Sequence, residues 1–254
     1  MFVKEFCKIS LFSLVILFFL TNKAQSQENQ GLYGETLCKK SDFHCLTVTE
    51  TTVEKEIKTK KGLKKREVKV AQTWAELWPN EREREIVMKV NRLNINLTGG
   101  MKIAVPNEMS DKTFMDFSPY PQNLGELDEK ILIWDPALLA WAAYDEEGKL
   151  VRWGPGVGGR DYCPDIGRRC HTITGNYKII KKGNAKTRSR KFHNAPMPWA
   201  MFFHKAGYAF HGSPKVPGQN ASHGCVRIFT PDAKWLNENF VKVGMAVIIN
   251  PYPE

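Results

Sequence analysis

From about residue 126 onward, the pattern of hydrophobic and polar positions is typical of β structure. Short runs of apolar, β-branched and aromatic residues alternate with turns rich in glycine, proline and acidic residues, and such runs predict strands. Strands are expected over residues 131–134, 140–144, 149–153, 176–181, 200–204, 208–211 and 245–250. One helix is expected from Pro231, which takes a favoured first-turn position, to about Phe240. The pattern therefore predicts a mainly β fold with one or two helices.

The middle of the chain changes to a helical period. Asn80, followed three positions later by Glu83, is a capping-box signature, which predicts that a helix begins there. Apolar residues then recur at helical spacing, at Ile86, Val87, Val90 and Leu93. A two-glycine turn leads to a short strand over 102–106. This helix, turn and strand is similar to the second half of a LysM-type glycan-binding module; a connecting helix and strand without a ligand is the alternative.

The N-terminal residues follow the order of a secretory signal peptide. Lys4 and Lys8 precede a charge-free apolar run over 9–20, and a small-residue site at 24–26 follows. Because this run is shorter than the roughly 20 residues needed to cross a bilayer, we expect a cleaved signal peptide over 1–26 rather than an anchor. The mature protein is then exported, to the periplasm or the cell surface, with no stable membrane span.

The segment between the signal peptide and the helical region is basic and polar. Threonine, glutamate and lysine dominate residues 51–69. This composition predicts an extended segment or hairpin that packs weakly on the rest, with its charges in solvent. We therefore divide the mature chain into a basic extended arm (27–70), a small LysM-like or linker module (71–125) and a β-rich domain (126–254).

The charge of the whole chain does not by itself identify a partner. Its formal net charge is +10 at pH 7. A basic exported protein meets wall carboxylates and acidic surface lipids more readily than nucleic acid, although solubility alone also explains such a charge. No nucleic-acid partner is expected.

The cysteines are more informative. Two pairs share the same seven-residue step, Cys38 with Cys45 and Cys163 with Cys170. In an oxidising compartment, such close pairs indicate local disulfides. Cys7 is lost with the expected signal peptide, so Cys225 is left over as a buried inert residue, an intermolecular linker or a reactive thiol.

The neighbours of Cys225 suit nucleophilic chemistry. A cysteine attacks as the thiolate, so it needs a base or a positive neighbour. His211 ends one predicted strand and Cys225 begins another, with His223 two residues before the cysteine. Gly224 lets the backbone approach a substrate closely, and amides around Cys225 could bind an oxyanion. The two histidines and the cysteine could instead be zinc ligands or structural residues.

An arginine lies close to the candidate nucleophile. If a strand runs from Cys225, its period of two places Cys225 and Arg227 on one face, with Val226 and Ile228 toward the core. A guanidinium beside the nucleophile suits a substrate that carries carboxylates.

Three short motifs follow one another in this region: His211-Gly212, Ser222-His223-Gly224-Cys225 and Val226-Arg227. Their order and residue types resemble the catalytic signature of the L,D-transpeptidases, the YkuD-type family. Met197-Pro198 and residues 172–177 are similar to two further family elements, with Ile173 in place of the usual proline. The resemblance covers about residues 126–252. It implies an L,D-transpeptidase-like β-sandwich with one or two helices, preceded by a small α/β module and the extended arm.

The resemblance also implies roles. Cys225 attacks the L-to-D bond of a peptidoglycan tetrapeptide stem, releasing D-alanine and leaving a thioester that an amine resolves into a 3→3 cross-link. His211 is the base, oriented by the carbonyl of Gly212, and His223 lines the site. Candidate substrate-binding residues are Arg227, Ser222, Gly224, Met197 and Tyr208. No metal or organic cofactor is implied, and carbapenems are expected to acylate Cys225.

Other readings of the same residues stay open. Water as acceptor gives an L,D-carboxypeptidase, and a lysine of a lipoprotein gives protein anchoring to the wall. A wall-binding surface-interaction protein, contacting glycan strands through the LysM-like segment and the arm, would use the domain only as a scaffold.

Overall fold

The computed structural model describes residues 32–59 and 62–253. The expected signal peptide, residues 1–26, lies outside the described part. From Leu32 onward the chain forms one compact unit. None of the helices within the described ranges has the length and hydropathy that crossing a membrane requires.

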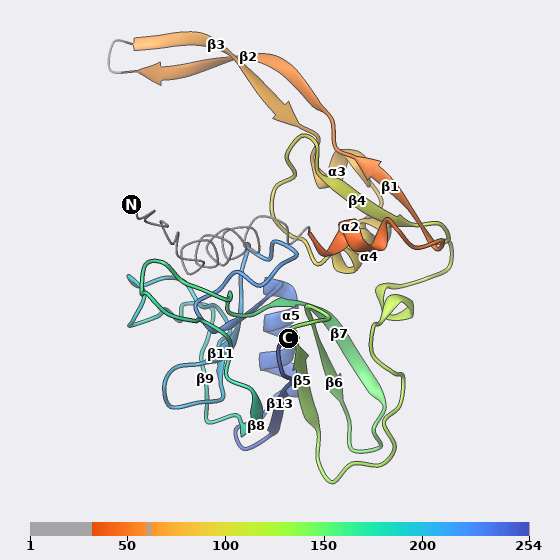
Figure 1. Ribbon diagram of the computed structural model, residues 1–254, viewed down its shortest axis with the longest axis vertical. Coiled ribbons are helices and arrows are strands. Elements are labelled where there is room, and N and C mark those ends of the chain that lie inside the picture. Colours follow the sequence, from red (N-terminus) through yellow and green to blue (C-terminus); the bar gives the residue numbers. More distant parts are fainter. Residues whose placement is uncertain (1–31, 60–61, 254) are drawn as a thin grey trace, which may run out of the picture. The chain divides into compact units, whose positions relative to one another are not determined.

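A nine-stranded curled sheet dominates the C-terminal half (Figure 1). Its strands lie in the order β8-β13-β5-β6-β7-β12-β11-β10-β9. Their bounds are β5 Ile131–Asp135, β6 Ala140–Tyr144, β7 Leu150–Val157, β8 Gly175–Lys178, β9 Lys181–Lys182, β10 Met201–Phe202, β11 Ala209–Gly212, β12 Val226–Ile228 and β13 Ala246–Ile249. The prediction of a mainly β fold with few helices is confirmed.

One face of this sheet packs on a helical segment. Helix α5 (Thr230–Trp235) continues into η2 (Leu236–Phe240), as expected for the helix after Pro231. Ala233 and Leu236 from this segment pack with the buried tryptophans Trp134 and Trp141. This helical segment completes the main core and packs on the sheet near β11 and β12.

The other face of the sheet is covered by the chain that leads into it. A short helical turn, η1 (Phe114–Phe117), packs with Trp153 of β7, whose indole nitrogen donates to the carbonyl of Phe114 over 2.9 Å. Both faces of the central strands are therefore buried, which explains why β6 is apolar throughout.

The N-terminal module, residues 32–112, contains a small second sheet. Strand β1 (Phe43–Thr47) pairs antiparallel with β4 (Lys102–Pro106), and helices α3 (Trp74–Leu77) and α4 (Glu81–Val90) lie between them in sequence. Helix α2 (Tyr33–Leu37) precedes β1, and the Cys38–Cys45 disulfide joins the two, as expected. Part of the segment expected as an arm is thus paired with β4 instead.

The N-cap of α4 is as expected only in part. The side chain of Asn80 accepts hydrogen bonds from the amides of Arg82 and Glu83. The reciprocal bond of a full capping box is found instead one helix earlier, between Thr73 and Glu76. The sequence identifies residues that can cap a helix. Which pair forms both hydrogen bonds of a capping box depends on the backbone conformation before the helix.

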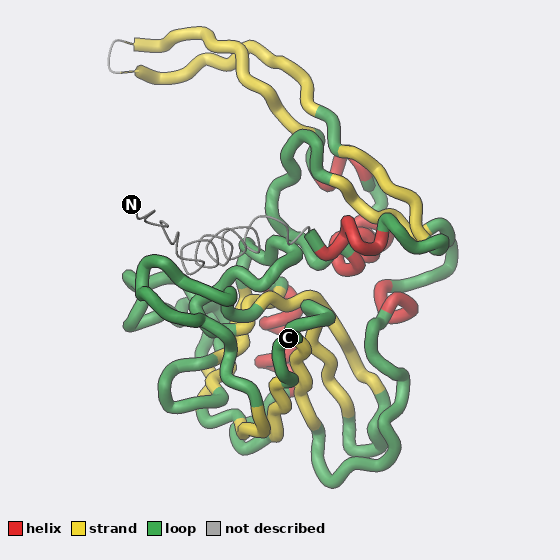
Figure 2. Tube along the Cα trace, viewed as in Figure 1, coloured by secondary structure: helices red, strands yellow, loops and turns green. Residues whose placement is uncertain are grey.

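The remainder of the expected arm is a hairpin. Strands β2 (Glu50–Thr59) and β3 (Gly62–Ala71) pair only with each other. Around the nine-stranded sheet, much of the chain between β7 and β12 is loop (Figure 2). These loops build the cavity described next.

Candidate active site

The register of two parallel strands brings the candidate residues to one face of the sheet. β11 pairs with β12 so that His211 lies opposite Arg227 and Phe210 opposite Val226. Cys225, one residue before β12, therefore lies on the same face as Arg227 and diagonally next to His211. Val226 and Ile228 are fully buried in the main core, as expected. The imidazole, the thiol and the guanidinium thus share one side of the sheet.

Cys225 is a free cysteine, partly exposed, at the wall of a cavity of about 550 Å³. Its Sγ lies 3.6 Å from the carbonyl oxygen of Gly207. Burial raises the pKa of this thiol, whereas the amide of Ala209 and the cations Arg227 and Lys191 oppose that rise. The resting group is therefore a thiol, with donors and cations placed to stabilise a thiolate when it forms.

His211 is held as a neutral base. The ring is almost fully buried, and its Nδ1 lies 2.9 Å from the carbonyl oxygen of Gly212. Because a carbonyl only accepts, Nδ1 carries the proton and Nε2 keeps a free lone pair. Burial lowers the pKa of His211 to about 4, and the bond to Gly212 opposes part of this shift. At neutral pH the imidazole can therefore accept a proton.

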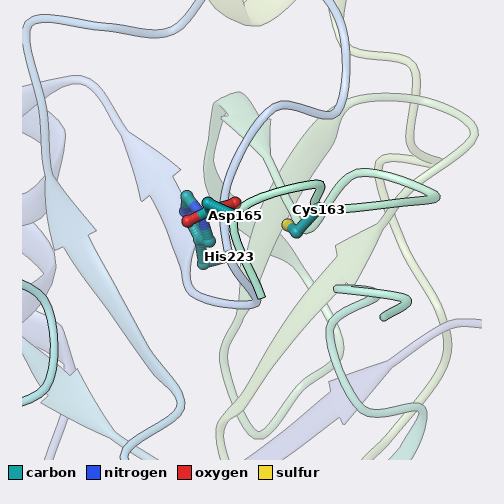
Figure 3. A group of neighbouring side chains, drawn as sticks. All are labelled: Cys163, Asp165 and His223. Atoms are coloured by element: carbon teal, nitrogen blue, oxygen red, sulfur yellow. The ribbon is translucent and has the colours of Figure 1, made fainter. Parts of the chain in front are cut away.

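The second histidine has a partner that the sequence did not indicate. His223 Nε2 lies 2.8 Å from Oδ2 of Asp165, which sits in the loop closed by the Cys163–Cys170 disulfide (Figure 3). The hydrogen bond to His223 lowers the pKa of this carboxyl group. On its other side, the His223 ring packs with Phe192 at 5.1 Å between centroids. His223 is thereby oriented at the cavity wall.

The zinc alternative does not fit this geometry. In the described part of the chain, the one group of three potential ligand atoms within 4.8 Å of one another belongs to Cys163, Asp165 and His223. The sulfur of Cys163 is bonded to Cys170. His211 and Cys225 do not join that group, so the three residues considered for zinc do not form a metal-binding set.

Ser222 and Gly224 shape the turn that presents the thiol. The hydroxyl of Ser222 donates to the carbonyl of Cys225 over 2.6 Å and accepts from the amide of Gly224 over 2.9 Å. Ser222 is 1% exposed, so its position does not suit substrate contact, and the amide of Gly224 is already bonded. Gly224 has a φ of +123°, and a Cβ there would lie 2.7 Å from Cε1 of Tyr208. The turn therefore requires glycine.

The cavity walls are strongly cationic. Among the described lining residues, none is acidic and six are basic: Arg168, Lys181, Arg188, Arg190, Lys191 and Lys205. Met197 and Tyr208, two of the candidate substrate-binding residues, also line the cavity, whereas His211 and Arg227 do not. The cavity therefore favours an anionic ligand.

Three of these cations lie on a loop that covers the cavity. In this cover loop, residues 187–197, the amide of Met197 donates to the carbonyl of Thr187 over 2.8 Å. Lys191 Nζ donates to the carbonyl of Ala206 over 2.8 Å, which ties the loop to the opposite wall. The cover loop thus carries positive charge close to Cys225.

Among the described residues, no carboxylate or carbonyl bonds the guanidinium of Arg227, whose side chain is partly exposed. Burial lowers the pKa of Arg227, and the nearby Arg160 adds to that shift. A substrate carboxylate would relieve both effects.

A family model described as the L,D-transpeptidase catalytic domain, YkuD, matches residues 130–249. These residues belong to that family. The match contains all nine strands of the large sheet together with His211, His223 and Cys225, whereas the N-terminal module lies outside it. The L,D-transpeptidase domain is thus the part of the chain that carries the cavity.

Solved structures of L,D-transpeptidases are similar to the chain over part of its length. The protein from Xylanimonas cellulosilytica is 24% identical, with a TM-score of 0.47 over 60% of this chain and 73% of its own. The Mycobacterium smegmatis protein is 20% identical, with a TM-score of 0.41 over 48% of this chain and 59% of its own. A Mycobacterium tuberculosis protein is 17% identical, with a TM-score of 0.40 over 61% and 75%. No curated protein matches the chain.

Three residues of the L,D-transpeptidase domain were missed from sequence. Asp165, Lys191 and Phe192 all reach the surroundings of His223 or Cys225. The basic run at 188–191 was a visible signal for the cover loop. The only feature of the sequence that pointed to Asp165 was its position inside the short Cys163–Cys170 loop. Its partner, His223, is 58 positions away.

Proposed function

We propose that this protein is an L,D-transpeptidase that uses Cys225 as its nucleophile on peptidoglycan tetrapeptide stems. The observation that carries the proposal is the shared face of β11 and β12. There a free, partly exposed thiol lies next to a histidine whose hydrogen bond to Gly212 leaves Nε2 unprotonated. General-base attack by a thiol needs such a pair, with the sulfur open to the substrate; Cys225 meets this condition because it lies at the wall of the cavity.

The first half-reaction forms a thioester. Nε2 of His211 takes the thiol proton as Sγ attacks the carbonyl carbon of the L-to-D bond. The carbon–nitrogen bond then breaks, and His211 returns the proton to the departing amine of D-alanine. Since burial favours the neutral thiol and neutral imidazole, proton transfer accompanies the attack rather than preceding it.

The second half-reaction transfers the acyl group. An acceptor amine loses a proton to His211 as it attacks the thioester carbonyl, and the sulfur leaves and regains a proton. The product is an amide, either a 3→3 cross-link between stems or a bond to a lysine of a lipoprotein. The cationic walls support an acidic substrate, because stem peptides carry free carboxylates that the cover loop would attract.

Intact-mass analysis tests the nucleophile. Wild-type protein incubated with a disaccharide-tetrapeptide is expected to gain the mass of that compound minus D-alanine, and carbapenem is expected to modify the same residue. Cys225→Ala should form neither adduct. His211→Gln should form them more slowly, by about 10²–10⁴-fold, the usual contribution of a general base. An adduct on the alanine variant, or on another residue, would end the proposal.

Product analysis then separates the acceptors. With an amine and water competing, a cross-linked or amidated product supports the transpeptidase, and exclusive release of a tripeptide indicates an L,D-carboxypeptidase. If no adduct forms at all while the protein pellets with wall sacculi, the wall-binding alternative is favoured. Deletion of residues 71–108 tests whether the LysM-like segment is responsible for that pelleting.

We place this activity outside the cytoplasm. The two seven-residue disulfides support an oxidising compartment, and the expected signal peptide supports export. Cleavage is checked by sequencing the N-terminus of the mature protein recovered from the periplasm or medium. An intact N-terminus on cytoplasmic protein with reduced cysteines would contradict it.

A further inference from the structure

The β2–β3 hairpin joins the rest of the described chain at its base, where Ala71 packs on the N-terminal module and the amide of Gly99 donates to Oε1 of Glu50 over 2.9 Å. Its two strands, Glu50–Thr59 and Gly62–Ala71, pair only with each other over ten residue pairs. Every residue of Glu50–Lys58 is exposed. A two-stranded ladder of this length presents two separate faces to its surroundings, because successive side chains point to opposite sides.

The register sorts the charges of the hairpin between these faces. Directly opposite residues share a face, so the pairs Lys55–Arg66 and Ile57–Lys64 lie on one side, and Glu54–Glu67 and Glu56–Lys65 on the other. We call the first side the cationic face; its members are Thr51, Val53, Lys55, Ile57, Thr59, Gly62, Lys64, Arg66, Val68 and Val70. We call the second side the mixed face; it carries all four glutamates of the two strands, Glu50, Glu54, Glu56 and Glu67.

The two faces differ in net charge. The mixed face carries Lys58, Lys65 and Lys69 beside the four glutamates, and Lys65 pairs with Glu54 at 3.4 Å. On the cationic face, Lys55, Lys64 and Arg66 form no ion pair within the described chain. Lys55 and Arg66 are directly opposite each other, an arrangement of like charges that destabilises a ladder. An anionic partner on the cationic face would remove that repulsion.

Aliphatic side chains lie among these cations. Val53 and Ile57 are 37% and 36% exposed, and both belong to the cationic face. No aromatic residue occurs in 50–71, so the face lacks the rings on which sugars or bases stack. Unpaired cations alternating with exposed aliphatic groups match a lipid surface, whose phosphates attract the cations and whose upper acyl region accepts the aliphatic groups.

We propose that the cationic face of the β2–β3 hairpin docks the protein on bilayers that contain anionic phospholipid. The contact is peripheral: Lys55, Lys64 and Arg66 approach the phosphates, and Val53 and Ile57 enter the interface between headgroups and chains. This role is independent of the cavity and holds whatever reaction Cys225 performs.

Vesicle binding tests the proposal with a matched pair of variants. The protein beginning at Gln27 is used, because the apolar run 9–20 would bind vesicles by itself, and every described residue is retained. One variant carries Lys55→Gln, Lys64→Gln and Arg66→Gln on the cationic face. The control carries Lys58→Gln, Lys65→Gln and Lys69→Gln on the mixed face. Both remove three positive charges from the same two strands.

Co-sedimentation with phosphatidylglycerol–phosphatidylcholine vesicles should separate the two variants. The cationic-face variant is expected to lose about fivefold in partition coefficient per cation, roughly 100-fold in total, and the mixed-face variant to keep most of its affinity. Equal losses of vesicle affinity in the two variants would show that binding depends on net charge and not on the cationic face, and would overturn the proposal. So would parent protein that fails to bind these vesicles, or a cationic-face variant that loses binding to purified wall sacculi but not to vesicles.

Two further measurements protect the test. Both variants should keep the thermal midpoint of the parent and its rate of Cys225 acylation, because neither face contributes to the cavity. Salt should weaken vesicle binding of the parent, since exposed charges more than a Debye length away are screened, and binding that is unchanged by salt would contradict a role for the three cations.

Discussion

At the scale of single residues, His211 links the site to the acid stability of the fold. Its pKa is lowered by burial to about 4, from an ordinary value of 6.5. Between these pH values the unfolded chain binds a proton at this position and the folded chain does not, so stability falls as pH falls through the window. A pKa shift of this size lowers the free energy of unfolding by up to about 3 kcal/mol at the acidic end of this pH window.

The variant His211→Gln isolates this contribution. It removes the titrating group, so its free energy of unfolding should fall less steeply than that of the wild type between pH 6.5 and pH 4. Urea unfolding at several pH values in this window measures both slopes. Parallel curves would mean that the folded and unfolded chains bind the proton at position 211 equally, so that burial does not lower the pKa of His211.

Gly224 offers a second test at this scale. Gly224→Ala combines an unfavourable φ of +123° with a contact of 2.7 Å to the Tyr208 ring, and we expect a loss of about 1–3 kcal/mol from the backbone strain alone. Because this turn positions Cys225, a distorted turn displaces the thiol, and the acylation rate should fall as well. Gly244→Ala is the control, since its φ is +94° with no atom within 4 Å of the added Cβ. It should lower the melting temperature without changing the acylation rate; slow acylation in both variants would remove the link to the turn.

Sequence and structure agree best for residues whose neighbours are close along the chain. His211 bonds the carbonyl of the next residue, Gly212, and Val226 and Ile228 face the core because of the two-residue period of a strand. Both features depend on neighbouring positions, so they could be predicted from the motif and the period. Ser222 was expected at the substrate, but its hydroxyl instead closes the turn to Cys225. The contact between Asp165 and His223 joins positions 58 apart, and no local pattern encodes such a distance.

At the scale of elements, strands and the long helix were predictable because their hydrophobic period is local. The strand expected over 176–181 is divided into β8 (Gly175–Lys178) and β9 (Lys181–Lys182), and the strand expected over 200–204 is only β10 (Met201–Phe202), because polar residues and glycines that line the cavity follow β9 and β10. The disulfide loop 163–170 illustrates what could not be predicted from the sequence. Its cysteine spacing predicted the bond, but the side chain that the loop presents to the site followed only from the tertiary structure.

The disulfide loop also yields a prediction. Cys163→Ser/Cys170→Ser opens the loop and should release Asp165 from His223, lowering the transfer rate several-fold. Asp165→Ala should have a similar effect, and the combined variant should fall no further, because the two changes remove one and the same contact. Cys38→Ser/Cys45→Ser opens the other seven-residue disulfide, in the N-terminal module, and serves as control. Additive losses would show that the loop acts on the site by another route.

At the scale of the whole molecule, the N-terminal module is more closely joined to the L,D-transpeptidase domain than the sequence suggested. Lys89 of α4, 2% exposed, forms an ion pair of 3.1 Å with the equally buried Asp232 of α5. Arg152 of β7 bonds the same carboxylate at 2.8 Å. A lysine on a helix is normally predicted to lie in solvent, so this contact could not be expected from pattern alone.

The module also contacts the chain between the proposed base and nucleophile. Asn94 donates from Nδ2 to the carbonyl of Ser213 over 2.7 Å and accepts from the amide of Val216 over 2.8 Å. The amide of Tyr33 donates to the carbonyl of Gly218 over 2.9 Å. The spacer that joins His211 to Cys225 is therefore fixed partly from outside its own domain.

Asn94→Ala removes both side-chain bonds to this spacer without touching the cavity. Each bond stabilises by about 1 kcal/mol, so the melting temperature should fall modestly. Since a small displacement of reacting groups lowers rates strongly, the acylation rate per folded molecule should fall by about tenfold or more. Asn91→Ala is the matched control: Asn91 is a buried asparagine of the same module, and within the described part of the chain its side chain bonds Val87 and Ala104 but no residue of the spacer. Its loss should lower stability and leave the acylation rate of the folded protein unchanged, and equal losses of rate in both variants would mean that the spacer holds its position unaided.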